Sequence, residues 1–402
     1  MTSSRDRAID RPLRVIFLSW RDSGHPEAGG AEAFLDHVSR HLAEQGHDVT
    51  VLTARYEGAA PDEMLDGRRF LRRGGRFSVY LWSLLRLFLR SRSVDVVVDV
   101  QNGIPFWSPL VTTKPVVNLV HHVHREQWPE VFGPGWWLES RVAPRVYAGS
   151  HYLVVSGATR DELAGLGVDP ERTTVVYSGR DPAPPGETLP TPQPSLAVLG
   201  RLVPHKRVEL AMDAINALRH RHPSLVLHVV GHGYWNDELH AYADRLGVTD
   251  AVRFHGFVDE AEKNAILGAA WVHVLPSLKE GWGLAIIEAG AHGVPSIAFR
   301  GASGTTESVL DARTGYLVDD VGELEAAIER LLLDPLRRRE LGEAAREFAQ
   351  TFTWAATGAE VELVLRRAIG LAVSSVPHQY AARTPEAVIG AVAPSAEAPQ
   401  TG

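Results

Sequence analysis

Short apolar runs alternate with segments of helical periodicity along most of this chain. The first run, Leu13 to Trp20, predicts a buried strand, and apolar positions then recur every three or four residues from Ala31 to about Gly46. A second buried strand follows at residues 48–54. This order predicts a βαβ unit with a right-handed crossover, and therefore a parallel sheet covered by helices.

The same alternation continues, stops and restarts. Further buried strands are predicted at residues 95–100, 116–122, 152–156 and 174–179. A proline-rich segment, residues 181–195, then interrupts the pattern and predicts a linker, because a residue before proline avoids the helical region. Beyond it, strands and helices alternate again. We therefore predict two doubly wound α/β domains, at 1–185 and 186–355, with a ligand cleft between the carboxyl ends of their sheets, and a disordered tail at 374–402.

Composition narrows the function classes. The 402 residues include no cysteine, which excludes disulfides, thiolate metal sites and cysteine nucleophiles. The net charge of −8 argues against a nucleic-acid partner. No apolar run approaches the length of a membrane span, and no signal peptide is recognisable, so we expect a cytoplasmic protein. Only four of the 41 basic residues are lysines, which makes a lysine the more informative cation: Lys114, Lys206, Lys263 and Lys279.

The most informative stretch runs from Glu280 to Ile297. Glu280 lies on a glycine-flanked loop after a predicted strand, and Glu288 lies eight residues later in the helix that this loop opens. Gly281 and Gly283 let the backbone approach a ligand closely, and a helix start offers free N–H groups to its oxygens. A carboxylate placed like Glu288 can accept two hydrogen bonds from ribose hydroxyls. The alternative is an ordinary helix start whose acid favours the dipole.

Two other loops follow the first strand of each domain. In the second domain, Gly200 and Arg201 precede Lys206, so that a planar guanidinium and a point charge can converge on one pyrophosphate. In the first domain, Gly29 and Gly30 precede a helix and are candidates for an anion cradle. A solvated basic loop and simple turn glycines are the alternatives. Dinucleotide-binding and Walker fingerprints are absent.

His121, His122 and His124 lie at the predicted carboxyl end of a first-domain strand. Three histidines in four residues suggest a metal, but the spacing supplies no carboxylate or fourth ligand, so we predict no metal site. We expect them to hydrogen-bond to a substrate hydroxyl or phosphate, with an exposed structural loop as the alternative.

A basic stretch covers residues 68–92, with eight arginines, no acid and an apolar segment at 79–89. It predicts an amphipathic surface that contacts an anionic membrane or an anionic acceptor. The alternative is a helix that faces the core and has a solvated arginine edge.

Together these motifs resemble the retaining glycosyltransferases of family 4, which have the GT-B fold of two facing Rossmann-like domains. The resemblance covers about residues 13–370. Ser178 stands where the family usually has Asn, and Trp282 where it more often has Phe. The motifs are the pair Glu280 and Glu288 within 279–299, Gly200-Arg201-Leu202 with Lys206, the GGAE at 29–32, Val155–Leu163, residues 175–181 and residues 306–315.

The resemblance implies transfer of a hexosyl-type sugar from a nucleotide diphosphate sugar to an acceptor hydroxyl, with retention of anomeric configuration. It implies no metal or other cofactor, and a helix at about 356–372 that returns to the first domain. No carboxylate is identifiable as a double-displacement nucleophile, so same-face attack by the acceptor is expected. The acceptor class, whether lipid, glycan or small natural product, stays open, as does a peripheral position on the inner membrane face.

Residue roles also follow from the resemblance. Arg201 and Lys206 would hold the diphosphate and offset the charge of the leaving group. Glu288 would bind the ribose, and Glu280 would bind hydroxyls of the sugar. The remaining expected donor contacts are Gly29 and Gly30 over the phosphates, Gly200, the loop of Gly281, Trp282, Gly283 and Leu284, and either His122 or His124 on the sugar.

Three other functions compete with this interpretation. An epimerase or hydrolase of the same fold would share the donor site but would use water, or no acceptor at all. An NAD-dependent oxidoreductase would need a glycine-rich turn directly after the first strand, whereas Gly29 comes nine residues after Trp20. A non-catalytic membrane-surface scaffold would depend on residues 68–92, and the intact acids and cations of the second domain argue against it.

Overall fold

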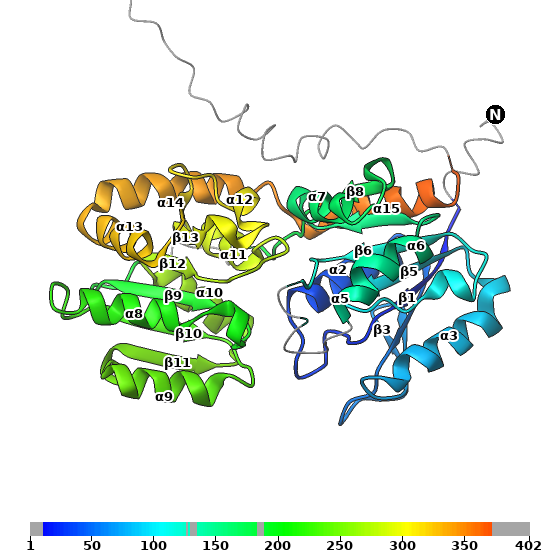
Figure 1. The fold of residues 1–402 in the computed structure, drawn as a ribbon, viewed down its shortest axis with the longest axis horizontal. Coiled ribbons are helices and arrows are strands. Elements are labelled where there is room, and N and C mark those ends of the chain that lie inside the picture. Colours follow the sequence, from blue (N-terminus) through cyan, green and yellow to red (C-terminus); the bar gives the residue numbers. More distant parts are fainter. Residues whose placement is uncertain (1–10, 126–127, 129–134, 183–188, 372–402) are drawn as a thin grey trace, which may run out of the picture.

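Apolar strands form the centre of two separate lobes in the computed structural model, which describes residues 11–125, 128, 135–182 and 189–371 (Figure 1). Strands such as β1 and the valine-rich β5 are buried along almost their whole length. The helices pack their apolar side on the sheets, as α2 does with Phe34, Leu35, Val38 and Leu42 at helical spacing. This arrangement confirms the predicted class of two doubly wound domains.

The first lobe contains an eight-stranded sheet in the order β3-β4-β2-β1-β5-β6-β7-β8. All neighbouring strands are parallel except β3 and β4 at one edge. Its elements are β1 (Arg14–Leu18), α2 (Gly30–Glu44), β2 (Asp48–Thr53), β3 (Asp62–Leu65), β4 (Arg68–Arg72), α3 (Ser78–Arg90), β5 (Val96–Gln101), β6 (Val116–Val120), α5 (Gly135–Trp137), α6 (Ala143–Val146), β7 (His151–Val154), α7 (Gly157–Gly165) and β8 (Thr173–Val175).

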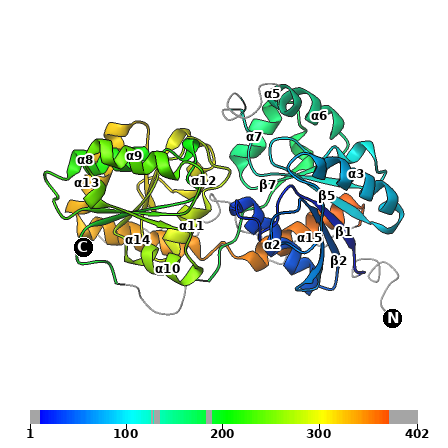
Figure 2. The same ribbon diagram turned by 90° about the horizontal axis from the view of Figure 1, so that it is seen from below.

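The second lobe has a six-stranded parallel sheet in the order β11-β10-β9-β12-β13-β14. Figure 2 shows helices on both of its faces. Its elements are β9 (Ser195–Leu199), α8 (Glu209–Leu218), β10 (Val226–Val230), α9 (Asn236–Leu246), β11 (Val252–Gly256), α10 (Glu260–Ala269), β12 (Val272–Leu275), α11 (Leu284–Ala291), β13 (Ser296–Phe299), α12 (Thr305–Ser308), β14 (Gly315–Val318), α13 (Val321–Leu333) and α14 (Pro335–Ala349).

The last described helix, α15 (Trp354–Ala368), leaves the second lobe and packs against α2 of the first (Figure 1). Thr357 donates its hydroxyl proton to the carbonyl of Tyr177 at 2.8 Å. Trp282 and Phe352 extend the apolar core of the first lobe into this junction. The predicted tail at 374–402 and residues 183–188 of the predicted linker lie outside the described residues.

The basic stretch at 68–92 is not one surface. Its first part is β4, where Arg68 and Arg72 are buried among acids. Arg68 pairs with Asp36 at 2.8 Å, and Arg72 pairs with Asp22 at 2.6 Å. The predicted amphipathic surface therefore does not include Arg68 and Arg72, because a buried guanidinium needs acid partners. Asp36 and Asp22 supply them from distant parts of the chain, and Asp66 and Glu63 from nearby positions.

Candidate active site

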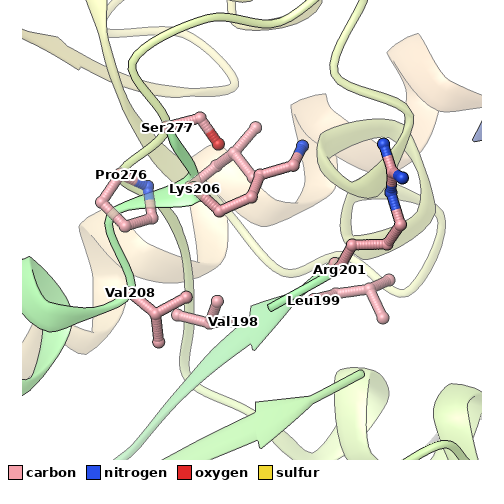
Figure 3. Close-up of a pocket in the computed structure, with 9 residues that line it drawn as sticks. Val198, Leu199, Arg201, Lys206, Val208, Pro276 and Ser277 are labelled. Carbon is pink, nitrogen blue, oxygen red and sulfur yellow. The ribbon is translucent and has the colours of Figure 1, made fainter. Parts of the chain in front are cut away.

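The carboxyl end of β9 carries the predicted basic loop of the second lobe. Gly200 and Arg201 follow the strand, and the short 3₁₀ turn Pro204–Lys206 brings Lys206 back beside the same strand end. With residues of β9, the end of β12 and the loop after it, they line a shallow recess. The charged ends of Arg201 and Lys206 point to the same side (Figure 3). The fold thus brings together the two cations that the sequence motif paired.

Lys206 also joins the second predicted motif. Its Nζ donates a hydrogen bond to Oε1 of Glu280 at 2.5 Å, although the two residues are 74 positions apart. Only 19% of the Lys206 side chain and 12% of the Glu280 side chain are exposed. A charge-assisted bond that is largely screened from water holds both groups in a defined geometry.

Arg201 reaches across to the first lobe. Burial lowers the pKa of its guanidinium, and the neighbouring cation Arg21 lowers it further, yet an arginine stays charged. A Cβ atom on Gly29 would lie 3.3 Å from Nε of Arg201. The amide of Gly29 already donates to Glu32 at 2.8 Å, and Gly30 begins α2. The glycine pair therefore lies beside the predicted diphosphate site, but the amide of Gly29 has a protein partner.

Glu288 lies one turn into α11, with 20% of its side chain exposed. Burial raises the pKa of its carboxyl group, and Lys263 opposes that shift from 2.7 Å away. Lys263, on α10, also contacts the exposed Glu260 at 2.8 Å. Lys263 belongs to none of the motifs recognised in the sequence; the rarity of lysine in this chain was the available signal.

The loop between the two glutamates is pressed against the first lobe. A Cβ atom on Gly281 would lie 2.2 Å from the carbonyl oxygen of His121, so no larger residue fits without displacing one of the two backbones. Gly283 has φ +91°, which glycine adopts at little cost, and Leu284 then begins α11. The carboxyl edges of the two sheets therefore meet at this loop, as the predicted cleft requires.

Trp282 was expected to contact the donor, but its side chain does not line the recess beside Arg201 and Lys206. Its side chain is 3% exposed, and its ring centroid lies 4.5 Å from that of Tyr177 and 5.1 Å from that of Phe352. The indole belongs to the apolar junction between the lobes, because a large ring next to Gly281 gains more by burial there than by exposure.

The histidines have different surroundings. His121 is buried, and its ring meets Phe34 edge-on at 5.4 Å. His124 lies 3.2 Å from a carboxylate oxygen of Glu139. The ring centroid of His122 lies 4.1 Å from that of His124, with the two planes tilted by 32°. The pKa of His122 is lowered well below the usual value, first by burial and then by neighbouring basic side chains, of which His124 has the largest effect and Lys206 the smallest. Glu139, which no sequence motif indicated, thus shapes this corner.

Two absences apply to the described part of the chain. No group of three or more histidine, aspartate and glutamate side chains there is arranged to hold a metal ion. Nor does any helix in the described ranges combine the length and apolar character that would carry it through a bilayer.

Comparisons with known proteins cover most of the chain. The family model "Glycosyltransferase Family 4" matches residues 28–184, and "Glycosyl transferases group 1" matches residues 180–348. A glycogen synthase of Mycobacterium tuberculosis is 28% identical over 88% of this chain and 95% of its own. A D-inositol 3-phosphate glycosyltransferase of Catenulispora acidiphila is 29% identical over 89% of this chain and 96% of its own.

Solved structures share the fold. A sucrose-phosphate synthase of Thermosynechococcus elongatus superposes with a TM-score of 0.76 at 21% identity, over 88% of this chain and 98% of that one. The Anabaena protein HepE, solved with UDP and glucose, superposes with a TM-score of 0.70 at 19% identity, over 88% of this chain and all of that one.

Proposed function

Since the chain belongs to glycosyltransferase family 4 and has the GT-B fold, we propose that it transfers a hexosyl group from a nucleoside diphosphate sugar to an acceptor hydroxyl with retention. One observation carries this proposal: Arg201, Lys206 and Glu280 converge at the carboxyl end of β9, where the second lobe meets the first. The solved complex of HepE with UDP and glucose supports a nucleotide-sugar donor.

Charge complementarity explains the chemistry that such a site can perform. The departing diphosphate gains negative charge as the glycosidic bond breaks, and the fixed cations Arg201 and Lys206 would stabilise it without reorganisation. These two cations would do the work that a divalent metal does elsewhere, so we propose metal-independent transfer. Glu280, held by Lys206, would bind hydroxyls of the sugar, and Glu288 would bind the ribose.

Of the two candidate histidines, we propose that His122 contacts the sugar. Its position near Lys206 supports this choice, whereas the ring of His124 lies against Glu139. A histidine with a lowered pKa is neutral near pH 7, and a neutral imidazole both donates and accepts hydrogen bonds.

A donor screen tests the proposed function. UDP, GDP and ADP, and the nucleotide sugars that correspond to them, are each added to the protein, and its thermal unfolding is measured. The matching nucleotide is expected to stabilise the protein by about 2.7 kcal/mol at a hundredfold excess over its dissociation constant. Retention is then checked by NMR of the anomeric proton of the product, and EDTA should leave the rate unchanged. Release of free sugar or of an epimer without acceptor would favour the hydrolase or epimerase alternative, and an absence of any nucleotide response would contradict the donor site.

We also propose a peripheral membrane contact, made by α3 and the turn before it rather than by the whole of residues 68–92. Val79, Ser83 and Leu87 form the buried side of α3, four residues apart. The opposite side exposes five large apolar residues, each 57–81% accessible: Phe77, Leu81, Leu85, Phe88 and Leu89. Arg86 and Arg90 lie one turn apart on the same helix, and Arg90 adds to the burial that lowers the pKa of Arg86. Apolar residues flanked by arginines suit an anionic bilayer surface.

Vesicle flotation tests this contact. Binding to phosphatidylcholine vesicles that contain phosphatidylglycerol is expected, with much weaker binding to phosphatidylcholine alone. Arg86→Ala with Arg90→Ala should weaken the binding by about 1 kcal/mol per arginine, and Leu81→Gln with Phe88→Gln should weaken it further. Leu336→Gln, on an exposed leucine of the second lobe, is the matched control and should float like the parent. Equal flotation of all variants would contradict the assignment.

A further inference from the structure

One acid of the first lobe, Glu162, bonds to two residues of the second lobe that lie next to Glu280. Glu162 lies on α7 of the first lobe, and its Oε1 accepts hydrogen bonds from Nζ of Lys279 and, at 2.9 Å, from the hydroxyl of Ser303. Lys279 directly precedes Glu280, and only 10% of its side chain is exposed. One carboxylate oxygen thus ties α7 to two points of the second lobe.

Ser303, the second partner of Glu162, lies in a segment that hydrogen-bonds to the backbone of Glu280. The two residues pair in an isolated parallel bridge, in which the amide of Glu280 donates to Ala302 at 2.9 Å and the amide of Gly304 donates to the carbonyl of Glu280 at 3.1 Å. Ser303 has φ +64° and ψ −103°, a conformation that is costly for a residue with a side chain. Its bond to Glu162 supports that conformation across the lobe junction.

Four residues further along, Glu307 makes a second connection to the same helix. Its carboxylate accepts the amide protons of Gly157 at 2.9 Å and Ala158 at 2.7 Å, together with the hydroxyl proton of Tyr177 at 2.8 Å. The first turn of α7 is thereby fixed to α12. Because this end of α7 is held in place, Glu162 stands at a defined distance from the Glu280 loop.

We propose that Glu162 is a positioning residue for sugar transfer. It keeps Glu280 correctly placed beside Lys206, and it does so only while α7 contacts the loop of residues 277–283. The proposal rests on the proposed function, since it assigns Glu280 to the donor sugar. Glu288 and Lys263, which lie on α11 and α10, have no bond to Glu162 in the described structure. Nucleotide binding and sugar transfer therefore respond differently to the loss of Glu162.

Turnover and binding are measured in Glu162→Gln and Lys279→Met. We expect kcat to fall about 10- to 100-fold, because a small displacement of a substrate-binding group is costly, while the dissociation constant of the matching nucleoside diphosphate stays within about twofold of the parent. The double variant should be no slower than the slower single variant, because both remove the same contact. The exchange Glu162→Lys with Lys279→Glu should recover part of the rate. Asp161→Asn, on the same helix with 71% of its side chain exposed, is the matched control and should behave like the parent.

Hydrogen–deuterium exchange without substrate tests whether Glu162 stabilises the Glu280 loop, and it does so independently of turnover. Residues 277–283 and 302–308 should exchange faster in Glu162→Gln and at the parent rate in Asp161→Asn. Unchanged exchange would overturn the proposal even if the protein transferred no sugar, and faster exchange would support it in that case too. An unchanged kcat, or a joint loss of nucleotide binding and thermal stability, would also overturn it, since the second result is the signature of a purely structural residue.

Discussion

Replacement of Lys206 by alanine is expected to lower kcat by about a thousandfold, the effect seen when one preorganised donor to a developing anion is removed. Lys206 offers a compact charge 2.5 Å from Glu280 in a site that is largely closed to water. Its loss removes a cation from the departing diphosphate and leaves the Glu280 carboxylate without its partner. Initial rates with the donor identified by the screen measure the effect.

Two variants show whether the effect is specific. Lys206→Arg should not restore the rate, because a planar guanidinium cannot replace a point charge in the same space. Lys114→Ala makes the same change two residues before β6, at the amino end of that strand, and should retain the parent rate. A Lys206→Ala protein that folds normally and turns over within about threefold of the parent would refute the role of this cation.

Glu288→Ala is expected to abolish the thermal response to nucleoside diphosphates. Hydrogen bonds to a charged acceptor contribute about 1.5–3 kcal/mol each, so the loss of two ribose contacts corresponds to at least a hundredfold in affinity. The substitution also leaves Lys263 with only the exposed Glu260 as a partner. Titration calorimetry with the matching nucleotide, alongside circular dichroism of the variant, measures the change.

The chain supplies a matched control for this substitution. Glu260→Ala removes the other acid that contacts Lys263, but the side chain of Glu260 is 67% exposed on the outside of α10. Its loss should leave the nucleotide affinity within about twofold, because exposed ion pairs contribute little. Equal losses in the two variants would mean that Glu288 acts only by orienting Lys263, and not as a ribose ligand.

Local patterns predicted much of this molecule because they need only neighbouring residues. Valine-rich runs and helical spacing identified the strands and helices of both lobes, and the glycines around Trp282 identified the loop before α11. The antiparallel edge strands β3 and β4 were not foreseen. Eight arginines without an acid between them predicted one amphipathic surface, since all the acids that pair with Arg68 and Arg72 lie before that stretch, from Asp22 to Asp66.

The candidate site also combines residues that a local motif identifies with partners that only the fold brings to them. Arg201, Lys206, Glu280 and Glu288 stand in short motifs whose chemistry can be recognised from spacing. Their partners come from other elements, and three of the four lysines of the chain pair with glutamates around the site: Lys206 with Glu280, Lys263 with Glu288 and Lys279 with Glu162. The scarcity of lysine suggested that these positions matter, but spacing along the chain could not assign the pairs.

The amino-acid sequence by itself predicted the α/β fold of two doubly wound domains, the resemblance to the family and the candidate residues for a nucleotide sugar, because periodicity and short motifs act over a few turns of chain. Only the tertiary structure decided that Trp282 packs between the lobes, that α3 exposes an apolar side, and that Glu162 on α7 of the first lobe bonds to the Glu280 loop of the second. Each of these depends on groups more than 60 residues apart, or on which side of a helix the sheet covers. Such contacts arise from the packing of whole elements, which no local pattern records.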